Sequence, residues 1–158
     1  MRKIDKIELN FGKPESGWLP TEFKYAEFEL NFDASDVPKI PTDLLCECLI
    51  STLKGIESKM YWFLEPGYYM FELIPNGKKI ELLISNSNVL NEKRKGIYKI
   101  SGDFESIILP LFRSLKKFDT LEFKDNDWEK INEIELNKLT ELIKERKNCL
   151  QQSIRNNA

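Results

Sequence analysis

Alternating apolar and polar positions predict a run of three strands in the middle of the chain. Residues 59–84 alternate in this way and contain two turn signals, Pro66-Gly67 and Asn76-Gly77. Proline presets φ at the second position of a type II turn, glycine accepts the positive φ of the third, and Asn-Gly is favoured in type I′ hairpins. We therefore expect a meander of three consecutive antiparallel strands.

The same alternation predicts strands on both sides of this meander. Residues 3–11 form the first strand and residues 23–32 the second, with Phe23 and Tyr25 out of phase with the positions that follow. Such a change of phase indicates a bulge or an aromatic pair on the outer face. Shorter strands are expected at residues 97–100 and 121–123. Four residues face each way along the second strand: Ala26, Phe28, Leu30 and Phe32 on one side, and Glu27, Glu29, Asn31 and Asp33 on the other.

Apolar side chains at helical spacing predict three helices, at residues 42–54, 103–118 and 135–154. Thr42 or Asp43 is the expected N-cap of the first, and Gly55 the residue that ends it. Pro110 either kinks the second helix or marks its true start, because proline removes a backbone hydrogen bond. The order of elements predicts one α+β domain over residues 1–158: an antiparallel twisted sheet of about five to six strands, with helices packed mainly on one face in a two-layer sandwich.

The chain contains no histidine, which excludes Ser-His-Asp and Cys-His catalysis and the commonest zinc ligand. The three cysteines, Cys46, Cys48 and Cys149, are an odd number and do not suggest a disulfide framework. Asp5 and Glu8 interrupt the N-terminal stretch, so it lacks the apolar core of a signal peptide. We therefore expect a cytoplasmic location and no cofactor.

One acidic segment resembles the opening of a calcium-binding loop. Asp125, Asp127 and Glu129 have the spacing of the first three ligands. However, Lys130 stands where the turn requires glycine, and Leu136 where the last carboxylate belongs. We interpret these acids as residues at the start of the last helix, with Asp127 as its cap, and not as metal ligands.

Charge is segregated along the chain although the net charge is only −2. Residues 22–65 contain nine acids and four bases, residues 76–118 contain nine bases and four acids, and residues 119–135 contain seven acids and two bases. The overall balance argues against attraction to nucleic acid or to an anionic membrane. Segregation fits either a charged face for a protein partner or solvated loops that differ in sign.

Two acidic groups are the candidate partner-binding residues. Trp128 lies within the second group; it is either an exposed anchor, since tryptophan is common among binding hot spots, or a residue that fixes the helix start to the core. The candidates in the predicted second strand are Glu27, Glu29 and Asp33, and those near the last helix are Asp125, Asp127, Trp128 and Glu129.

Several segments together resemble one known family in their order and character: FKYAEFELNF, DLLCECLISTLKG, WFLEPGYYMFEL and DFESIILPLFRSL. In layout, most of residues 22–142 is similar to the immunity proteins encoded beside polymorphic or contact-dependent bacterial toxins. The resemblance implies a non-enzymatic inhibitor that binds the C-terminal domain of one cognate toxin in the cytoplasm. Such toxins are often basic nucleases, which suits the acidic segments, but the family's binding surfaces vary and no interface residue transfers by matching.

Two alternatives from other classes remain. A small carboxylate-dependent hydrolase or nucleotide-processing enzyme would present a concave pocket with converging acids and lysines. A homodimeric adaptor module would pair through a contiguous apolar patch on the outer face of the sheet.

Overall fold

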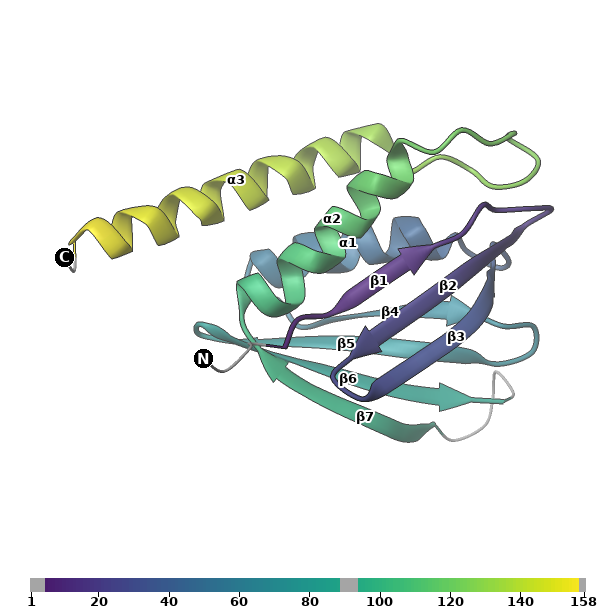
Figure 1. The fold of residues 1–158 in the computed structure, drawn as a ribbon, viewed down its shortest axis with the longest axis horizontal. Helices are drawn as coiled ribbons and strands as arrows, with labels where there is room; N and C mark the ends of the chain where they lie inside the picture. Colours follow the sequence, from purple (N-terminus) through teal and green to yellow (C-terminus); the bar gives the residue numbers. More distant parts are fainter. Residues whose placement is uncertain (1–4, 89–93, 157–158) are drawn as a thin grey trace.

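A computed structural model describes residues 5–88 and 94–156 of the chain and shows an α+β fold built on a seven-stranded antiparallel sheet. Each strand pairs with its neighbours in chain order, from β1 at one edge to β7 at the other (Figure 1). The predicted fold class is confirmed, with more strands than the five to six expected. The strands are β1 (Glu8–Phe11), β2 (Trp18–Tyr25), β3 (Phe28–Ser35), β4 (Ser58–Phe63), β5 (Tyr68–Asn76), β6 (Lys79–Ser87) and β7 (Lys95–Gly102).

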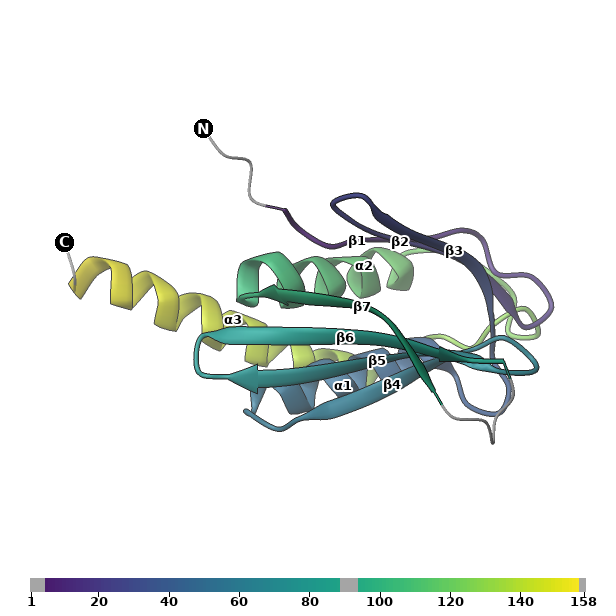
Figure 2. The same cartoon turned by 90° about the horizontal axis from the view of Figure 1, so that it is seen from below.

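Three α-helices and one short π-helical turn pack on the inner side of the sheet. These elements are α1 (Pro41–Leu53), the π-helical turn η1 (Phe104–Ile108), α2 (Leu109–Asp119) and α3 (Glu133–Asn156). Helix α1 packs against β4 and β5, α2 against β1, and α3 against α1. Figure 2 shows α2 between the first strands and the later ones, so this helix fills the inside of the curved sheet.

The strand expected at residues 23–32 is in fact part of a hairpin. Strands β2 and β3 pair from Trp18 opposite Ser35 to Tyr25 opposite Phe28, and Ala26 in the turn has a φ of 53°. The change of phase at Tyr25 therefore marks this tight turn and not a bulge. Strand β2 begins at Trp18, five residues before the expected start at residue 23. Residues 3 and 4 of the expected first strand lie outside the described residues.

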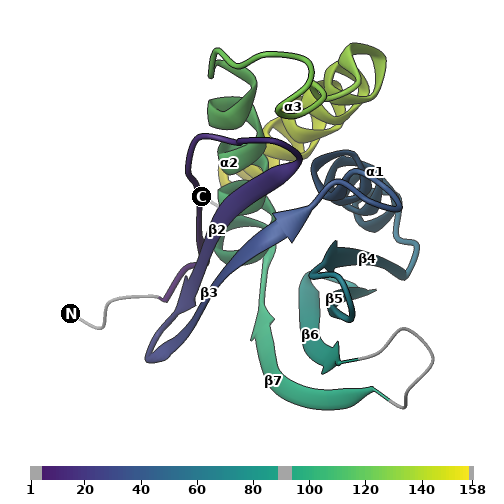
Figure 3. The same cartoon turned by 90° about the vertical axis from the view of Figure 1, so that its right-hand side faces the viewer.

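The sheet divides into two parts that diverge between β3 and β4. These strands share one pair, Ser35 opposite Phe63, and Figure 3 shows them separating beyond it. We call β1–β3 the N-terminal arm and β4–β7 the central sheet. Aromatic contacts join the two parts across the space between them. Their ring centroids are 5.1 Å apart for Phe23 and Phe71, 5.9 Å for Phe32 and Trp62, and 4.2 Å for Phe28 and Tyr98.

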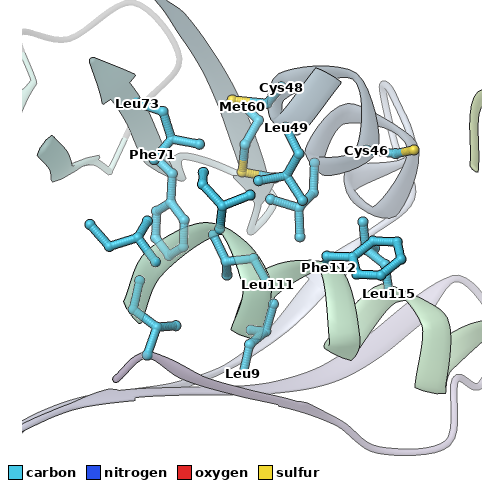
Figure 4. Packing of buried hydrophobic residues seen from close by; sticks show 14 of the residues in the cluster. Leu9, Cys46, Cys48, Leu49, Met60, Phe71, Leu73, Leu111, Phe112 and Leu115 are labelled. Carbon is cyan, nitrogen blue, oxygen red and sulfur yellow. The ribbon is translucent and has the colours of Figure 1, made fainter. Parts of the chain in front are cut away.

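The main core lies between the helices and the inner face of the sheet. Figure 4 shows Leu49 of α1, Met60 and Phe71 of the central sheet and Leu111 of α2 converging there, with Leu9 of β1 beneath α2. Each of these side chains is at most 5% exposed. The apolar alternation of the strands and the apolar stripes of the helices thus meet in one cluster.

The two turns of the central meander agree with the prediction only in part. Asn76 pairs with Lys79, so Gly77 and Lys78 form the two-residue connection. Gly77 has a φ of 65° and Lys78 does not have a positive φ, which is the pattern of a type II′ turn and not of type I′. Between β4 and β5, Gly67 has the positive φ, 88°, that the predicted type II turn requires at its third position, and Glu65, just before Pro66, also has a positive φ.

The helix boundaries confirm two predictions and correct a third. Gly55 follows α1 with a φ of 79°, and Pro110 stands in the first turn of α2, which is the true start of that helix. However, α1 begins after Ile40 with no side-chain cap, so neither Thr42 nor Asp43 is its N-cap. The strand expected at residues 121–123 is absent from the described structure.

Candidate protein-binding surface

The outer face of the N-terminal arm is an acidic surface built by the alternation of its three strands. Residues that face outward from neighbouring strands lie opposite one another: Lys24 lies between Glu8 and Glu29, and Glu22 between Asn10 and Asn31. We call this surface the acidic face. It carries four carboxylates and one lysine among its outward residues, which are Glu8, Asn10, Trp18, Pro20, Glu22, Lys24, Glu29, Asn31 and Asp33.

Polar contacts order one half of the acidic face. The Lys24 ammonium lies 3.5 Å from the Glu22 carboxylate, which also accepts a hydrogen bond of 3.4 Å from the Asn10 amide. The Asn31 amide donates to the Glu29 carboxylate over 2.9 Å. Among the described residues no hydrogen bond or ion pair holds the side chain of Asp33, so its charge is available to a partner.

Trp18 supplies an exposed aromatic ring beside these carboxylates. Its side chain is 38% exposed, and the rim of a shallow depression of about 440 Å³ includes both Trp18 and Asp33. A second shallow depression, of about 580 Å³, continues along the strands between Asn10 and Asp33. Trp18 was not among the candidate residues because the second strand was expected to begin only at residue 23; the signal available in the sequence was its position two residues before Pro20, in phase with the outward side of β2.

The structure brings the second acidic segment next to this face. The connection between α2 and α3, residues 120–132, carries Asp127, whose carboxylate accepts a hydrogen bond of 3.0 Å from the backbone N–H of Ser16. The backbone carbonyl of Asp127 accepts another, of 2.8 Å, from Gly17. Asp125 and Glu129 are exposed on the same connection. Glu27 lies instead in the β2–β3 turn, at the opposite end of the strands from Trp18.

Trp128 is not the exposed anchor that the sequence allowed. Its side chain is fully buried, and its indole Nε1–H donates to the Thr42 hydroxyl over 3.1 Å. Trp128 therefore fixes the connection to the start of α1, which was the other interpretation. Asp127 is not a helix cap either, because α3 begins at Glu133 and the Asn132 side chain accepts from the Glu135 N–H.

The buried titratable groups lie around α1, away from the acidic face. The Asp43 carboxylate accepts a hydrogen bond of 3.1 Å from the backbone N–H of Asn132. Burial raises the pKa of Asp43, and the charges of Glu129 and Glu135 raise it further, against the lowering effect of that hydrogen bond. Asp43 thus helps to position the connection.

The two cysteines of α1 are poorly suited to act as nucleophiles. Burial raises the pKa of the Cys46 thiol to about 12 and that of Cys48 to about 11. Nearby carboxylates add to the effect at Cys46, whereas hydrogen bonds from Ser58 and Thr52 oppose it at Cys48. Both thiols are therefore protonated at neutral pH, and nucleophilic cysteine chemistry requires the thiolate.

Over residues 5–88 and 94–156, no group of three or more histidine, cysteine, aspartate or glutamate side chains could hold a metal ion. In the same part of the chain, none of the helices combines the length and apolar character needed to cross a membrane. Comparison with known proteins gives no match to a protein-family model, to a curated protein or to a solved structure.

Proposed function

We propose that this protein is a non-enzymatic immunity protein that binds and neutralises the C-terminal domain of a cognate bacterial toxin. The observation that supports the proposal best is the acidic face, which carries four carboxylates and one lysine and has the exposed ring of Trp18 at one end, beside Asp33. The order of segments that resembles the immunity proteins supports it as well. Binding through the acidic face requires no catalytic groups.

Charge gives the physical mechanism of recognition. An acidic surface accelerates encounter with a basic domain and selects against acidic partners. Trp18 supplies the large, partly exposed ring that commonly carries binding energy at the centre of an interface. Asp33 lies beside it, with no partner among the described residues, so a basic group of the toxin could pair with Asp33 without breaking an existing ion pair.

The proposal is tested by co-expression with the C-terminal domain of the large protein encoded immediately upstream. We expect the two chains to purify together and the growth of cells expressing the toxin domain to be rescued. No complex and no rescue would contradict the proposal.

A charge reversal then tests the acidic face. The variant Glu29→Lys/Asp33→Lys is expected to slow association at low salt by roughly tenfold or more, with an unchanged melting temperature. The control Glu57→Lys/Glu145→Lys changes the net charge equally at exposed positions outside this face. Equal loss of binding in both variants would show that net charge, and not the acidic face, drives recognition.

A further inference from the structure

Strand β3 has an open edge inside the sheet, on the side that faces β4. Along β2, the backbone N–H and C=O groups of successive residues point alternately toward β1 and toward β3. The Pro20 carbonyl points toward β1, because it accepts a hydrogen bond from the Gly12 N–H. The residue opposite Pro20 is Asp33, whose backbone groups therefore point away from β2. The same holds for Asn31 and Glu29, which lie two and four residues before Asp33, respectively.

This edge meets β4 at one point only. Ser35, the next residue with the same orientation, pairs with Phe63 of β4, and the strands separate beyond that pair. Over the described residues, no backbone hydrogen bond is formed on this side by Glu29, Asn31 or Asp33. Each of the three is exposed. Two residues apart along one strand, they present the hydrogen-bonding pattern that a further strand would complete.

The outer edges of the sheet are protected in other ways. On β1, the Leu9 carbonyl accepts a hydrogen bond of 2.6 Å from the Ser114 hydroxyl of α2. Just before β1, the Ile7 N–H donates to the Ser106 carbonyl over 3.0 Å. On β7, Lys95 and Lys99 are exposed, and edge lysines are a common means of preventing strand addition.

A partly exposed apolar row lies on the inner side of the open edge. Phe32 contacts Tyr69 at 4.9 Å between ring centroids, and Phe28 stacks on Tyr98 at 4.2 Å. These four rings and Leu30 are only half-buried, whereas the core residues next to them are buried. An added strand would shield this row from water with its own inward side chains.

We propose that the open edge of β3 binds an extended segment of the protein partner as an additional strand. Its backbone would pair with Glu29, Asn31 and Asp33, a mode of recognition known as β-augmentation. Alternate side chains of the segment would be basic, facing the carboxylates of the acidic face, and apolar, facing the half-buried row. The identity of the partner rests on the proposed function; the edge itself does not.

A second copy of this chain is a poor occupant of the same edge. In a symmetric antiparallel pair centred on Asn31, Glu29 of one copy would lie opposite Asp33 of the other, at both ends of the pairing. Like charges directly opposite each other destabilise a sheet. The charge pattern therefore selects a basic strand.

The first test uses the full chain and a synthetic peptide of alternating lysine and valine, with a glutamate and valine peptide as the control. We expect the lysine peptide, at about 1 mM, to shift the backbone amide resonances of Glu29, Asn31 and Asp33 and to slow their exchange with solvent. The glutamate peptide should do neither. Unchanged amides with the lysine peptide, or equal shifts with both peptides, would overturn the proposal.

A pair of variants at Asn31 isolates the backbone contribution. Asn31→Pro removes the N–H that faces the open edge, at an edge position where proline leaves the pairing with β2 intact. Asn31→Ala also loses the side-chain hydrogen bond to Glu29 but keeps that N–H. Asn31→Pro should bind the lysine peptide about tenfold more weakly than Asn31→Ala. Equal affinity in two folded variants would overturn the proposal, and the exchange measurement on the natural chain decides it if Asn31→Pro does not fold.

The same two variants separate this inference from the proposed function. If the toxin domain binds both equally well, the proposed function stands and strand addition is wrong. If the toxin domain does not bind the natural chain while the peptide protects the three amides, the proposed function fails and the open edge remains a binding site.

Discussion

Replacing Trp128 with phenylalanine tests whether this residue holds the connection between α2 and α3 in place. The indole is fully buried and donates to the Thr42 hydroxyl, which is itself buried. Leaving that hydroxyl without its partner costs about 1–3 kcal/mol. The smaller phenylalanine ring leaves a cavity that adds roughly 1 kcal/mol. The expected loss of about 2–4 kcal/mol is a large share of the 5–15 kcal/mol typical of a domain.

Trp18→Phe is the matched control, because Trp18 is 38% exposed and its indole has no hydrogen-bond partner among the described residues. Such a surface substitution should cost less than about 0.5 kcal/mol. The assay is urea unfolding followed by far-ultraviolet circular dichroism, since the loss of an indole would distort a fluorescence signal. An unchanged dependence on urea concentration in both variants would show that the denatured states remain comparable.

A double-mutant cycle with Thr42→Val isolates the hydrogen bond itself. Trp128→Phe and Thr42→Val should each destabilise the protein, and the double variant should cost about 1 kcal/mol less than the sum of the single changes. Additive costs would show that the Nε1–Oγ1 contact contributes nothing. Equal costs for Trp128→Phe and Trp18→Phe would refute the assignment of Trp128 to the core.

Two further predictions concern the groups around α1. With Ellman's reagent at about pH 8, the folded protein should show one rapidly reacting thiol, the exposed Cys149. Cys46 and Cys48 are buried and should react only when the protein unfolds. Rapid reaction of a second thiol in the folded protein would contradict the raised pKa values of Cys46 and Cys48. Because the pKa of Asp43 is raised in the folded state, that state binds the proton more tightly, and stability should fall as the pH rises above roughly 4. Asp43→Asn should remove this part of the pH dependence, and parallel urea midpoints for the two proteins between about pH 4 and 7 would contradict the reasoning.

Local patterns predicted much of the fold because they are set by short-range constraints. The alternation of the central meander, the apolar stripes of the helices, Gly55 after α1 and Pro110 at the start of α2 all follow from backbone geometry within a few residues. Errors arose where one pattern fits two local structures. The change of phase at Tyr25 is produced equally by a bulge and by a two-residue turn, and only the pairing of β2 with β3 decides between them.

The candidate site depends on contacts between distant segments, which no local pattern contains. From the sequence alone, the acidic character of residues 22–65 and 119–135 and the outward direction of Glu29 and Asp33 on a strand could be determined. Tertiary structure decided that Trp128 is buried against Thr42, that Trp18 is exposed, and that Asp127 joins the loop of Ser16. Both tryptophans have the same preference for burial, and which of them is shielded from water depends on which segments pack together.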